Sequence, residues 1–228
     1  MGCFNRIFIA AMAITLLLLC GAPAFADVEV YMQPPTLDGN LWASQNDIGG
    51  LGNFATLYDN FQIFQAIPYY LDDVEWFGGY WNTQTNAITG WTISLYANVP
   101  GLPDQPGGVI WSQYFSVAYA GYMETCNLPF GMCSYDMDSI MGGYKLMPNT
   151  TYWLSVVPDL SFPPQWGWGS GLMGDGLAYQ DFYIGGRSQT GVDFAFNLQG
   201  IPTPEPGSLI LLGTGILGLA GALRRKLF

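Results

Sequence analysis

The stretch Trp91-Thr92-Ile93-Ser94-Leu95-Tyr96-Ala97 carries the clearest folding signal in this chain. Its residues alternate between two faces, which is the period of a β-strand with one buried side. The apolar set consists of Trp91, Ile93, Leu95 and Ala97, and the other set of Thr92, Ser94 and Tyr96. Residues 192–199 repeat the alternation, with Asp193, Asn197 and Gln199 opposite Val192, Phe194, Phe196 and Leu198. Both stretches predict half-buried strands.

Further strand candidates lie at residues 61–66, 109–117, 152–157 and 177–184. Turn sequences rich in Pro, Gly and Asn separate the candidates, at 99–101, 105–108, 147–149 and 185–186. No segment of this region sustains a 3.6-residue apolar period. Many short strands separated by turns predict an all-β outer domain over residues 27–200, a β-sandwich of jelly-roll type. A β-helix is less favoured, because the chain shows no fixed internal period.

The charge balance excludes several classes of function. The formal net charge is -11, and only two of the six cations, Lys145 and Arg187, lie between the terminal segments. An outer domain this acidic repels phosphate backbones, so we expect no nucleic-acid partner. Solubility explains the acidity most simply, and Ca²⁺ held by a few carboxylates is the alternative.

The chain contains no histidine. Ser-His-Asp and Cys-His catalysis and histidine ligation of metals are therefore excluded, whereas a mechanism that uses only Asp and Glu is not. We expect a protein that is not an enzyme and needs no cofactor, with Ca²⁺ as the possible exception.

Residues 1–26 read as a secretory signal peptide. Arg6 supplies a positive charge, an apolar run follows at 7–20, and Ala24-Phe25-Ala26 fits the small-residue cleavage pattern. Cleavage is therefore expected before Asp27. Cys20 does not indicate a lipoprotein, because the residue before a lipidated cysteine is normally small and here it is Leu19. An uncleaved N-terminal anchor is the alternative.

The C-terminal tail, residues 201–228, has three parts in a fixed order. Pro204-Glu205-Pro206 comes first, then the nearly uncharged run 209–223, then the basic cluster Arg224-Arg225-Lys226. The prolines stop a preceding strand. The apolar run predicts a short transmembrane helix, and the basic cluster keeps the C-terminus cytoplasmic, which places the outer domain outside the inner membrane.

This tail resembles the PEP-CTERM sorting signal of Gram-negative bacteria. The resemblance implies that an exosortase, a membrane protease-transpeptidase, recognises the tail and removes or exchanges it after export. It also implies a producing cell with an exopolysaccharide matrix. The segments 93–96, 101–103, 146–154 and 193–200 are similar to a common outer-domain type of such proteins, which implies a β-sandwich without an assigned activity. An ordinary anchor with a chance Pro-Glu-Pro is the alternative.

Cys126 and Cys133 are the cysteines that remain after signal cleavage. An exported protein meets an oxidising compartment, and the six residues between them include Pro129 and Gly131, so we expect a disulfide that closes this loop. Zinc binding is disfavoured, because two thiols without histidine fall short of a zinc ligand set.

Two pairs of tryptophans are candidates for sugar binding. Trp166 and Trp168 lie in a Pro- and Gly-rich stretch that reads as a loop, and Trp76 and Trp81 flank Gly78-Gly79. An exposed indole face can stack on the apolar face of a sugar ring. The favoured interpretation is that the loop residues fold back over the edge of the sandwich. Trp91, Trp111 and Trp153 lie inside strand patterns and are expected to pack in the core.

The densest carboxylate cluster is Asp72, Asp73 and Glu75. Glycoside hydrolysis needs two carboxylates at a set separation across a sugar, which neighbours on one strand do not guarantee. A solvated acidic edge or a calcium ligand set is the preferred interpretation of this cluster.

Three classes of function follow from these features. The first is an exported structural or interaction protein of the cell surface or exopolysaccharide matrix, transiently anchored in the inner membrane. The second is a carbohydrate-binding module that uses exposed tryptophans. The third is a carboxylate-only glycosidase or lyase. The sequence names no glycan, protein partner or oligomeric state.

We predict that the mature protein begins at Asp27, because Ala24 and Ala26 match the small pockets of signal peptidase. N-terminal sequencing of the exported protein measures this directly. An N-terminus at Met1, or a lipid attached to Cys20, would contradict the prediction.

Overall fold

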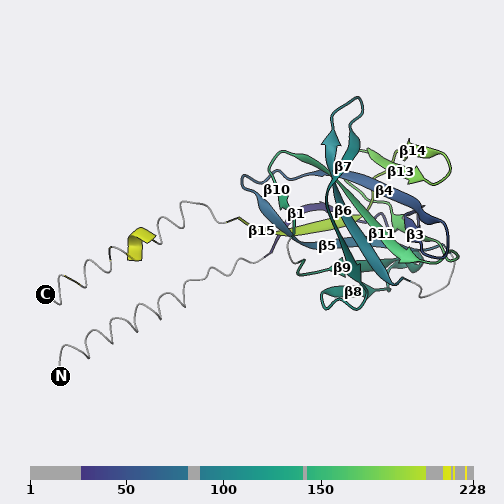
Figure 1. Ribbon diagram of the computed structural model, residues 1–228, viewed down its shortest axis with the longest axis horizontal. Helices are drawn as coiled ribbons and strands as arrows, with labels where there is room; N and C mark the ends of the chain where they lie inside the picture. The colour runs from purple at the N-terminus through teal and green to yellow at the C-terminus, as the bar shows by residue number, and fades with distance from the viewer. Residues whose placement is uncertain are drawn as a thin grey trace, which may run out of the picture.

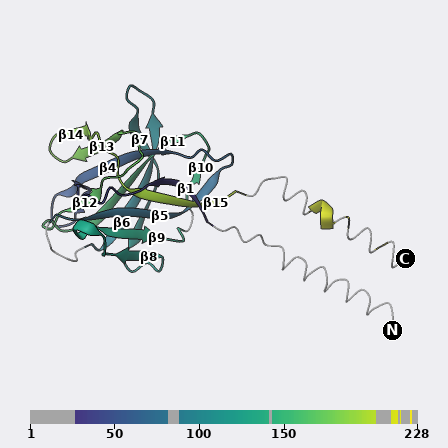
Figure 2. The same cartoon turned by 180° about the vertical axis from the view of Figure 1, so that it is seen from behind.

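The computed structural model describes residues 27–81, 88–140, 143–203, 213–216, 218 and 224. Residues 27–203 form a sandwich of two β-sheets, seen from two sides in Figures 1 and 2. The all-β prediction is therefore confirmed. The predicted signal peptide and most of the tail lie outside the described residues. The helical residues that the structure does describe, at 213–216, 218 and 224, form no helix long and apolar enough to cross a membrane.

The first sheet has the strand order β1-β15-β5-β12-β2, with β8, β9 and β10 attached beside β5. Its strands are β1 (Val28–Gln33), β15 (Phe196–Pro202), β5 (Tyr69–Tyr80), β12 (Trp166–Gly169), β2 (Leu41–Ala43), β8 (Tyr122–Thr125), β9 (Cys133–Met137) and β10 (Lys145–Leu146). A short 3₁₀ turn, η1 (Pro129–Gly131), lies between β8 and β9.

The second sheet has the order β14-β13-β4-β3-β11-β6-β7. Its strands are β14 (Gly186–Gln189), β13 (Ala178–Phe182), β4 (Gly52–Gln62), β3 (Gln45–Asp47), β11 (Thr151–Leu160), β6 (Gly90–Val99) and β7 (Gln105–Ser116). The pairings are antiparallel except for β11 with β3. The predicted strand at 91–97 lies within β6, and Trp91, Ile93 and Leu95 are fully buried as its alternation requires.

The strand predicted at 192–199 begins only at Phe196. Before that point the backbone leaves the regular ladder, and Ala195 forms backbone hydrogen bonds with two different segments. Ala195 N donates to Gly169 O at 2.8 Å, and Ala195 O accepts from Phe77 N at 3.2 Å. The side-chain alternation continues through this irregular stretch, so Phe194 is fully buried although it lies outside the strand.

Strand β5 organises the first sheet because it pairs along both of its edges. Strands β15 and β12 follow one another along one edge, and β10 and β9 along the other. Its Val74 and Trp76 are fully buried, as their alternating position predicts. The strand therefore contributes to the core along its length while its intervening residues face outward.

The core between the sheets is unusually aromatic. Trp76 of the first sheet meets Trp91 of the second with ring centroids 4.8 Å apart, and Trp91 meets Trp166 at 5.1 Å. Tyr135 stacks on Trp76 at 5.9 Å. Each of these side chains is fully buried. Burying an aromatic ring removes about 150–250 Å² from water, so this inter-sheet layer supplies a large share of the hydrophobic free energy.

Both ends of the domain emerge beside each other. Val28 pairs with Gly200, so the start of β1 lies next to the end of β15. Tyr69, the first residue of β5, pairs with Pro202 at the same end. The opposite end of β5 is Tyr80, about 36 Å away at the rise of an extended strand. Figures 1 and 2 show β1 and β15 side by side at this end.

The predicted disulfide between Cys126 and Cys133 is present, with the two Cα atoms 4.1 Å apart. It joins the residue after β8 to the first residue of β9 and so closes the hairpin that contains η1. Cys133 is buried in the core cluster, whereas Cys126 is exposed. The bond therefore ties a surface loop to the interior.

We predict that replacing both cysteines, Cys126→Ala with Cys133→Ala, lowers the free energy of unfolding by about 2–3 kcal/mol, because a short loop gains conformational freedom in the unfolded chain. Urea unfolding of the variant measures the loss. Reduction of the wild-type protein is the matched control and should give a similar loss. Equal urea midpoints for the oxidised wild type and the variant would contradict the prediction.

Candidate functional site

A groove of about 350 Å³ lies where the edge of the first sheet meets the second. We call it the edge groove. Strand β2 supplies one wall and β13 the other, and one further residue follows directly after β5. Its lining residues are Leu41, Trp42, Ala43, Trp81, Gln180 and Phe182. The volume lies within the range of about 300–1,000 Å³ that small-molecule sites occupy.

The walls of the edge groove are held by packing and by one buried hydrogen bond. The ring of Trp42 meets the edge of the buried Phe194 ring at a centroid distance of 6.4 Å. Phe182 meets Phe54 at 5.2 Å in a T-shaped arrangement. The amide of Gln180 crosses between the sheets and donates from Nε2 to the backbone oxygen of Ala43 at 2.8 Å. The groove is therefore a preformed feature of the fold.

The chemistry of the lining suits a ring-shaped ligand with polar edges. Trp81 is 50% exposed, so part of its indole face is free to stack on a ligand. Gln180 brings an amide group, which can exchange hydrogen bonds with hydroxyls. None of the six described lining residues is an acid or a base. This set of side chains can bind a sugar but offers no group for proton transfer.

The expectation of exposed tryptophans is wrong for three of the four candidates. Trp76, Trp166 and Trp168 are each 0% exposed. Trp166 Nε1 donates to the hydroxyl of Tyr135 at 3.2 Å, and Trp168 Nε1 donates to the backbone oxygen of Ala195 at 2.8 Å. These three indoles belong to the core, so they offer no face to a polysaccharide.

The reason is that Trp166-Gly167-Trp168-Gly169 forms strand β12 and not a loop. The strand alternation puts both indoles on the inner face. Glycine opposite them makes room: a Cβ on Gly78 would collide with the Trp166 ring. The period-two spacing of the two tryptophans was the signal that could have revealed this strand.

Trp81 is the tryptophan candidate that the structure places in the groove. Its partner there, Trp42, was missed by sequence reasoning, as were Gln180 and Phe182. The short strand β2 carries Trp42, and three residues are too few to show an alternation. Only tertiary packing brings β2, β13 and Trp81 together.

The outer face of the first sheet carries a second polar feature. It consists of the side chains of Asp73, Glu75 and Asp136, and we call it the carboxylate row. Glu75 on β5 lies between Asn197 on β15 and Asp136 on β9, each directly paired with it. Ser134 Oγ donates to Glu75 Oε1 at 3.0 Å. Asp73 lies on the same face, two residues from Glu75, and is 8% exposed.

The predicted cluster of Asp72, Asp73 and Glu75 is divided by the structure. Asp73 and Glu75 belong to the carboxylate row. Asp72 instead lies with Asp27 and Asp138, near the start of β5, with carboxylate oxygens within 4.8 Å of one another. A register shift between β5 and β15 at this point accounts for the split.

Burial and crowding change the acidity of the carboxylate row. Burial, followed by the neighbouring Asp136 carboxylate, raises the pKa of Asp73 to about 9. Burial also raises the pKa of Glu75, although the hydrogen bond from Ser134 opposes this. Asp73 is therefore protonated at neutral pH and can donate to the Asp136 carboxylate, as two crowded carboxyl groups sharing a proton do.

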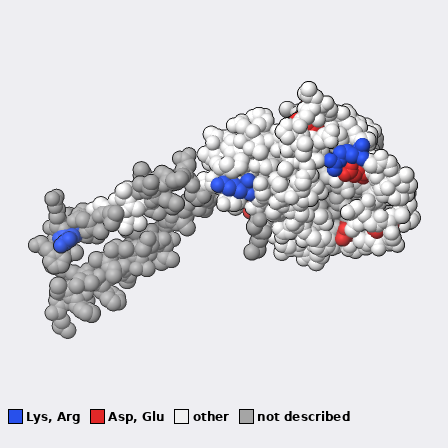
Figure 3. All heavy atoms as spheres, turned by 45° about the horizontal axis from the view of Figure 1, so that its top comes forward, with Lys and Arg blue, Asp and Glu red and all other residues white. Residues whose placement is uncertain are grey.

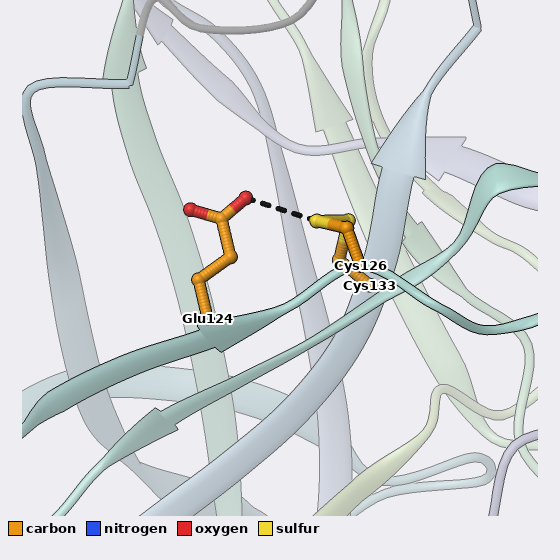
Figure 4. A group of neighbouring side chains, drawn as sticks. All are labelled: Glu124, Cys126 and Cys133. Carbon is orange, nitrogen blue, oxygen red and sulfur yellow. Dashed lines mark hydrogen bonds between the residues drawn. A yellow bond between two sulfur atoms is a disulfide. The ribbon is translucent and has the colours of Figure 1, made fainter.

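Figure 4 shows a group formed by Glu124 and the two cysteines of the disulfide. Glu124 Oε1 lies 3.2 Å from Cys126 Sγ. Because both sulfurs are bonded to each other, the group offers no thiolate to a metal ion. It is a structural feature of the β8–β9 hairpin.

Basic side chains are sparse on the face shown in Figure 3, and they lie apart from one another. Arg187 forms an ion pair with Asp181, at 2.8 Å between Nη2 and Oδ2, and its guanidinium stands 4.9 Å from the centre of the Tyr58 ring. Its positive charge is thus paired with Asp181 and the Tyr58 ring within the second sheet.

Residues 202–226 match the family model of the PEP-CTERM protein-sorting motif. The comparisons with curated proteins and with solved structures gave no match. The motif indicates an exported protein that an exosortase sorts and processes at the membrane. Of its residues, Pro204, Glu205, Pro206, Arg225 and Lys226 lie outside the described part of the structure, and Arg224 is helical. In the signal region Ala24 and Ala26 also lie outside it, and Asp27 directly precedes β1.

We predict that the stability of the protein falls as the pH rises from about 4 towards 9. The folded state keeps a proton on Asp73 over this range, whereas the unfolded chain releases it around the ordinary aspartate pKa of 3.8. Asp73→Asn mimics the protonated carboxyl group and should make the pH dependence of the urea midpoint shallower.

Glu29→Gln, an exposed change on strand β1 of the same sheet, is the control and should leave the pH profile unchanged. Parallel profiles for the wild type and Asp73→Asn would show that Asp73 releases its proton normally in the folded state.

Proposed function

We propose that this chain is a non-catalytic protein of the cell surface or exopolysaccharide matrix that binds polysaccharide through the edge groove. The observation that carries the proposal is the combination of a half-exposed Trp81, the Trp42 and Phe182 rings and the Gln180 amide in one preformed groove. Aromatic faces with a few fixed polar groups are the usual lining of sites for small neutral ligands. The PEP-CTERM tail supports the assignment to the outside of the cell.

The position of the groove supports the same function. The tail begins next to the end of β15, beside the first residue of β5. Trp81 follows the last residue of β5, so it lies at the opposite end of this strand. A protein held at a membrane by its tail would thus present the groove away from the tail. A matrix polymer could reach it there without meeting the attachment point.

The absence of histidine and the neutral lining favour binding over catalysis in this groove. The acidic carboxylate row lies on the outer face of the first sheet, formed by strands β15, β5 and β9. The described groove lining includes none of its residues. A glycosidase or lyase is therefore the less favoured proposal. The jelly-roll connectivity, the signal peptide, the transmembrane helix and the final location at the surface or matrix remain predictions.

We predict that Trp81→Ala weakens polysaccharide binding about tenfold, because loss of one stacking contact costs on the order of 1–1.5 kcal/mol. Titration of the purified chain with laminarin, xylan, xanthan and alginate, followed by tryptophan fluorescence, measures the affinity. Phe64→Ala, which removes an aromatic ring 74% exposed outside the groove, is the matched control. Absence of binding by the wild type, or equal losses in the two variants, would exclude the groove as the site.

A second prediction concerns the tail. Glu205→Ala should leave export intact and block tail removal, so that a larger membrane-bound form accumulates, because the Pro-Glu-Pro motif is the recognised part of the sorting signal. Ser208→Ala, just beyond the motif, is the control and should be processed normally. Immunoblots of membrane and extracellular fractions separate the two forms. If wild type and Glu205→Ala both keep Phe228 and fractionate together, the tail acts as a plain anchor.

A further inference from the structure

Three buried oxygen-bearing side chains and one exposed aspartate gather at the loop 171–177, and we call them the Asp59 cluster. The members are Gln33, Asp59, Asp175 and Asp193. Gln33 ends β1 and is 1% exposed, and Asp59 lies in β4 and is 0% exposed. Asp193 is 8% exposed, and Asp175 is part of the loop. The cluster belongs neither to the edge groove nor to the carboxylate row.

Two oxygens of the cluster have no hydrogen-bond partner although they are buried: Gln33 Oε1 and Asp59 Oδ1. The orientation of the Gln33 amide is settled by its other end. Nε2 donates to Asp59 Oδ2 at 2.8 Å and to the backbone oxygen of Phe194 at 3.1 Å, and both of these are acceptors. Exchanging the amide nitrogen and oxygen would place oxygen against oxygen. Gln33 Oε1 is therefore an acceptor without a donor.

Gln33 Oε1 points towards the Asp193 carboxylate. Both Gln33 Oε1 and Asp193 Oδ2 crowd the point where a Cβ of residue 174 would stand, and that residue is Gly174. Ligands of one Ca²⁺, held at about 2.3–2.6 Å, can stand up to about 5 Å apart. The amide of Gln33 thus lies between two carboxylates, with its nitrogen on Asp59 and its free oxygen beside Asp193.

The donors around the cluster do not satisfy all of its buried oxygen acceptors. Phe194 N donates to Asp59 Oδ2 at 2.5 Å, and Gly176 N donates to both oxygens of Asp193 at 2.9 Å. Asp175 accepts from Asn60 Nδ2 at 3.0 Å. The salt bridge found among the described residues belongs to Arg187 and Asp181, so it does not serve this cluster.

An unpartnered buried acceptor destabilises the fold, and a positively charged occupant would remove that cost. We propose that the Asp59 cluster binds a divalent cation of the oxygen-preferring class, Ca²⁺, through Gln33 Oε1, Asp59 Oδ1 and the Asp193 carboxylate. Carboxylate and amide oxygens without nitrogen or sulfur are the ligands that Ca²⁺ prefers. Water would complete the coordination, and the largely exposed loop at 171–177 adjoins the site through Gly174.

The proposed site is connected to the edge groove through Phe194. Phe194, whose backbone bonds to both Gln33 and Asp59, places its ring 6.4 Å from Trp42 and 5.3 Å from Trp168. An ion that orders Asp59 therefore orders the residue on which a groove wall rests.

Titration of the full-length purified protein with CaCl₂ after treatment with EDTA tests the proposal. Calorimetry should show one Ca²⁺ per chain, and saturating Ca²⁺ should raise the melting temperature, because it binds the folded state alone. Asp59→Asn should abolish both effects, and Asp193→Asn should weaken binding at least tenfold. Asp138→Asn, from the separate group with Asp27 and Asp72, is the control and should bind Ca²⁺ as the wild type does.

Three outcomes would overturn the proposal. Calcium without effect on the wild type, together with an Asp59→Asn variant of undiminished stability, would show that a proton or a water molecule occupies the site. Binding that survives in Asp59→Asn and Asp193→Asn but is lost in Asp138→Asn would place the ion in the other group. Should Asp59→Asn fail to fold, Tb³⁺ luminescence displaced by Ca²⁺ in the wild type and lost in Asp193→Asn decides the question, and an unchanged signal in Asp193→Asn counts against the site.

Discussion

The packing of large aromatic rings between the two sheets is the constraint on which the rest of the structure depends. Trp76, Trp91 and Trp166 meet at centroid distances of about 5 Å and fill the centre of the sandwich. The Trp166 ring lies against the neighbouring strand β5 of its own sheet, where a Cβ at position 78 would collide with it, which explains the need for glycine there. The same packing removes Trp76, Trp166 and Trp168 from the surface, and Trp81 is the candidate that stays exposed.

Strand β5 runs between the two ends of the domain, from Tyr69 to Tyr80. It pairs with four strands, and its first residues lie beside the point where the sorting tail begins. Its last residue leads into the edge groove. A continuous strand of twelve residues is stiff because its ladders hold it on both sides. The start of the sorting tail and the edge groove are therefore separated by the length of one strand.

The outer domain has only two basic residues, Lys145 and Arg187, so most of its carboxylates need partners other than a basic side chain. Three carboxyl groups show different solutions. Asp47 accepts hydrogen bonds from the backbone N–H groups of Phe162, Leu51 and Gly49, and these bonds lower its pKa. Burial and the Asp136 carboxylate keep a proton on Asp73. Asp59 has one oxygen saturated and the other without a partner. The physical problem is the same in each case, since a buried carboxylate needs donors, a proton or a cation.

The sequence by itself determined the all-β class, the disulfide between Cys126 and Cys133 and the sorting tail, because period-two alternation, two remaining cysteines and an ordered motif are all local patterns. It did not reveal that Trp166 and Trp168 form a buried strand, because the flanking prolines and glycines read as a loop. Only the tertiary structure decided which side chains share a site. The edge groove joins β2, Trp81 and β13, and the Asp59 cluster joins the end of β1 to β4 and two loops. Such meetings depend on the order in which strands pair across a sheet, and no local pattern in the chain records that order.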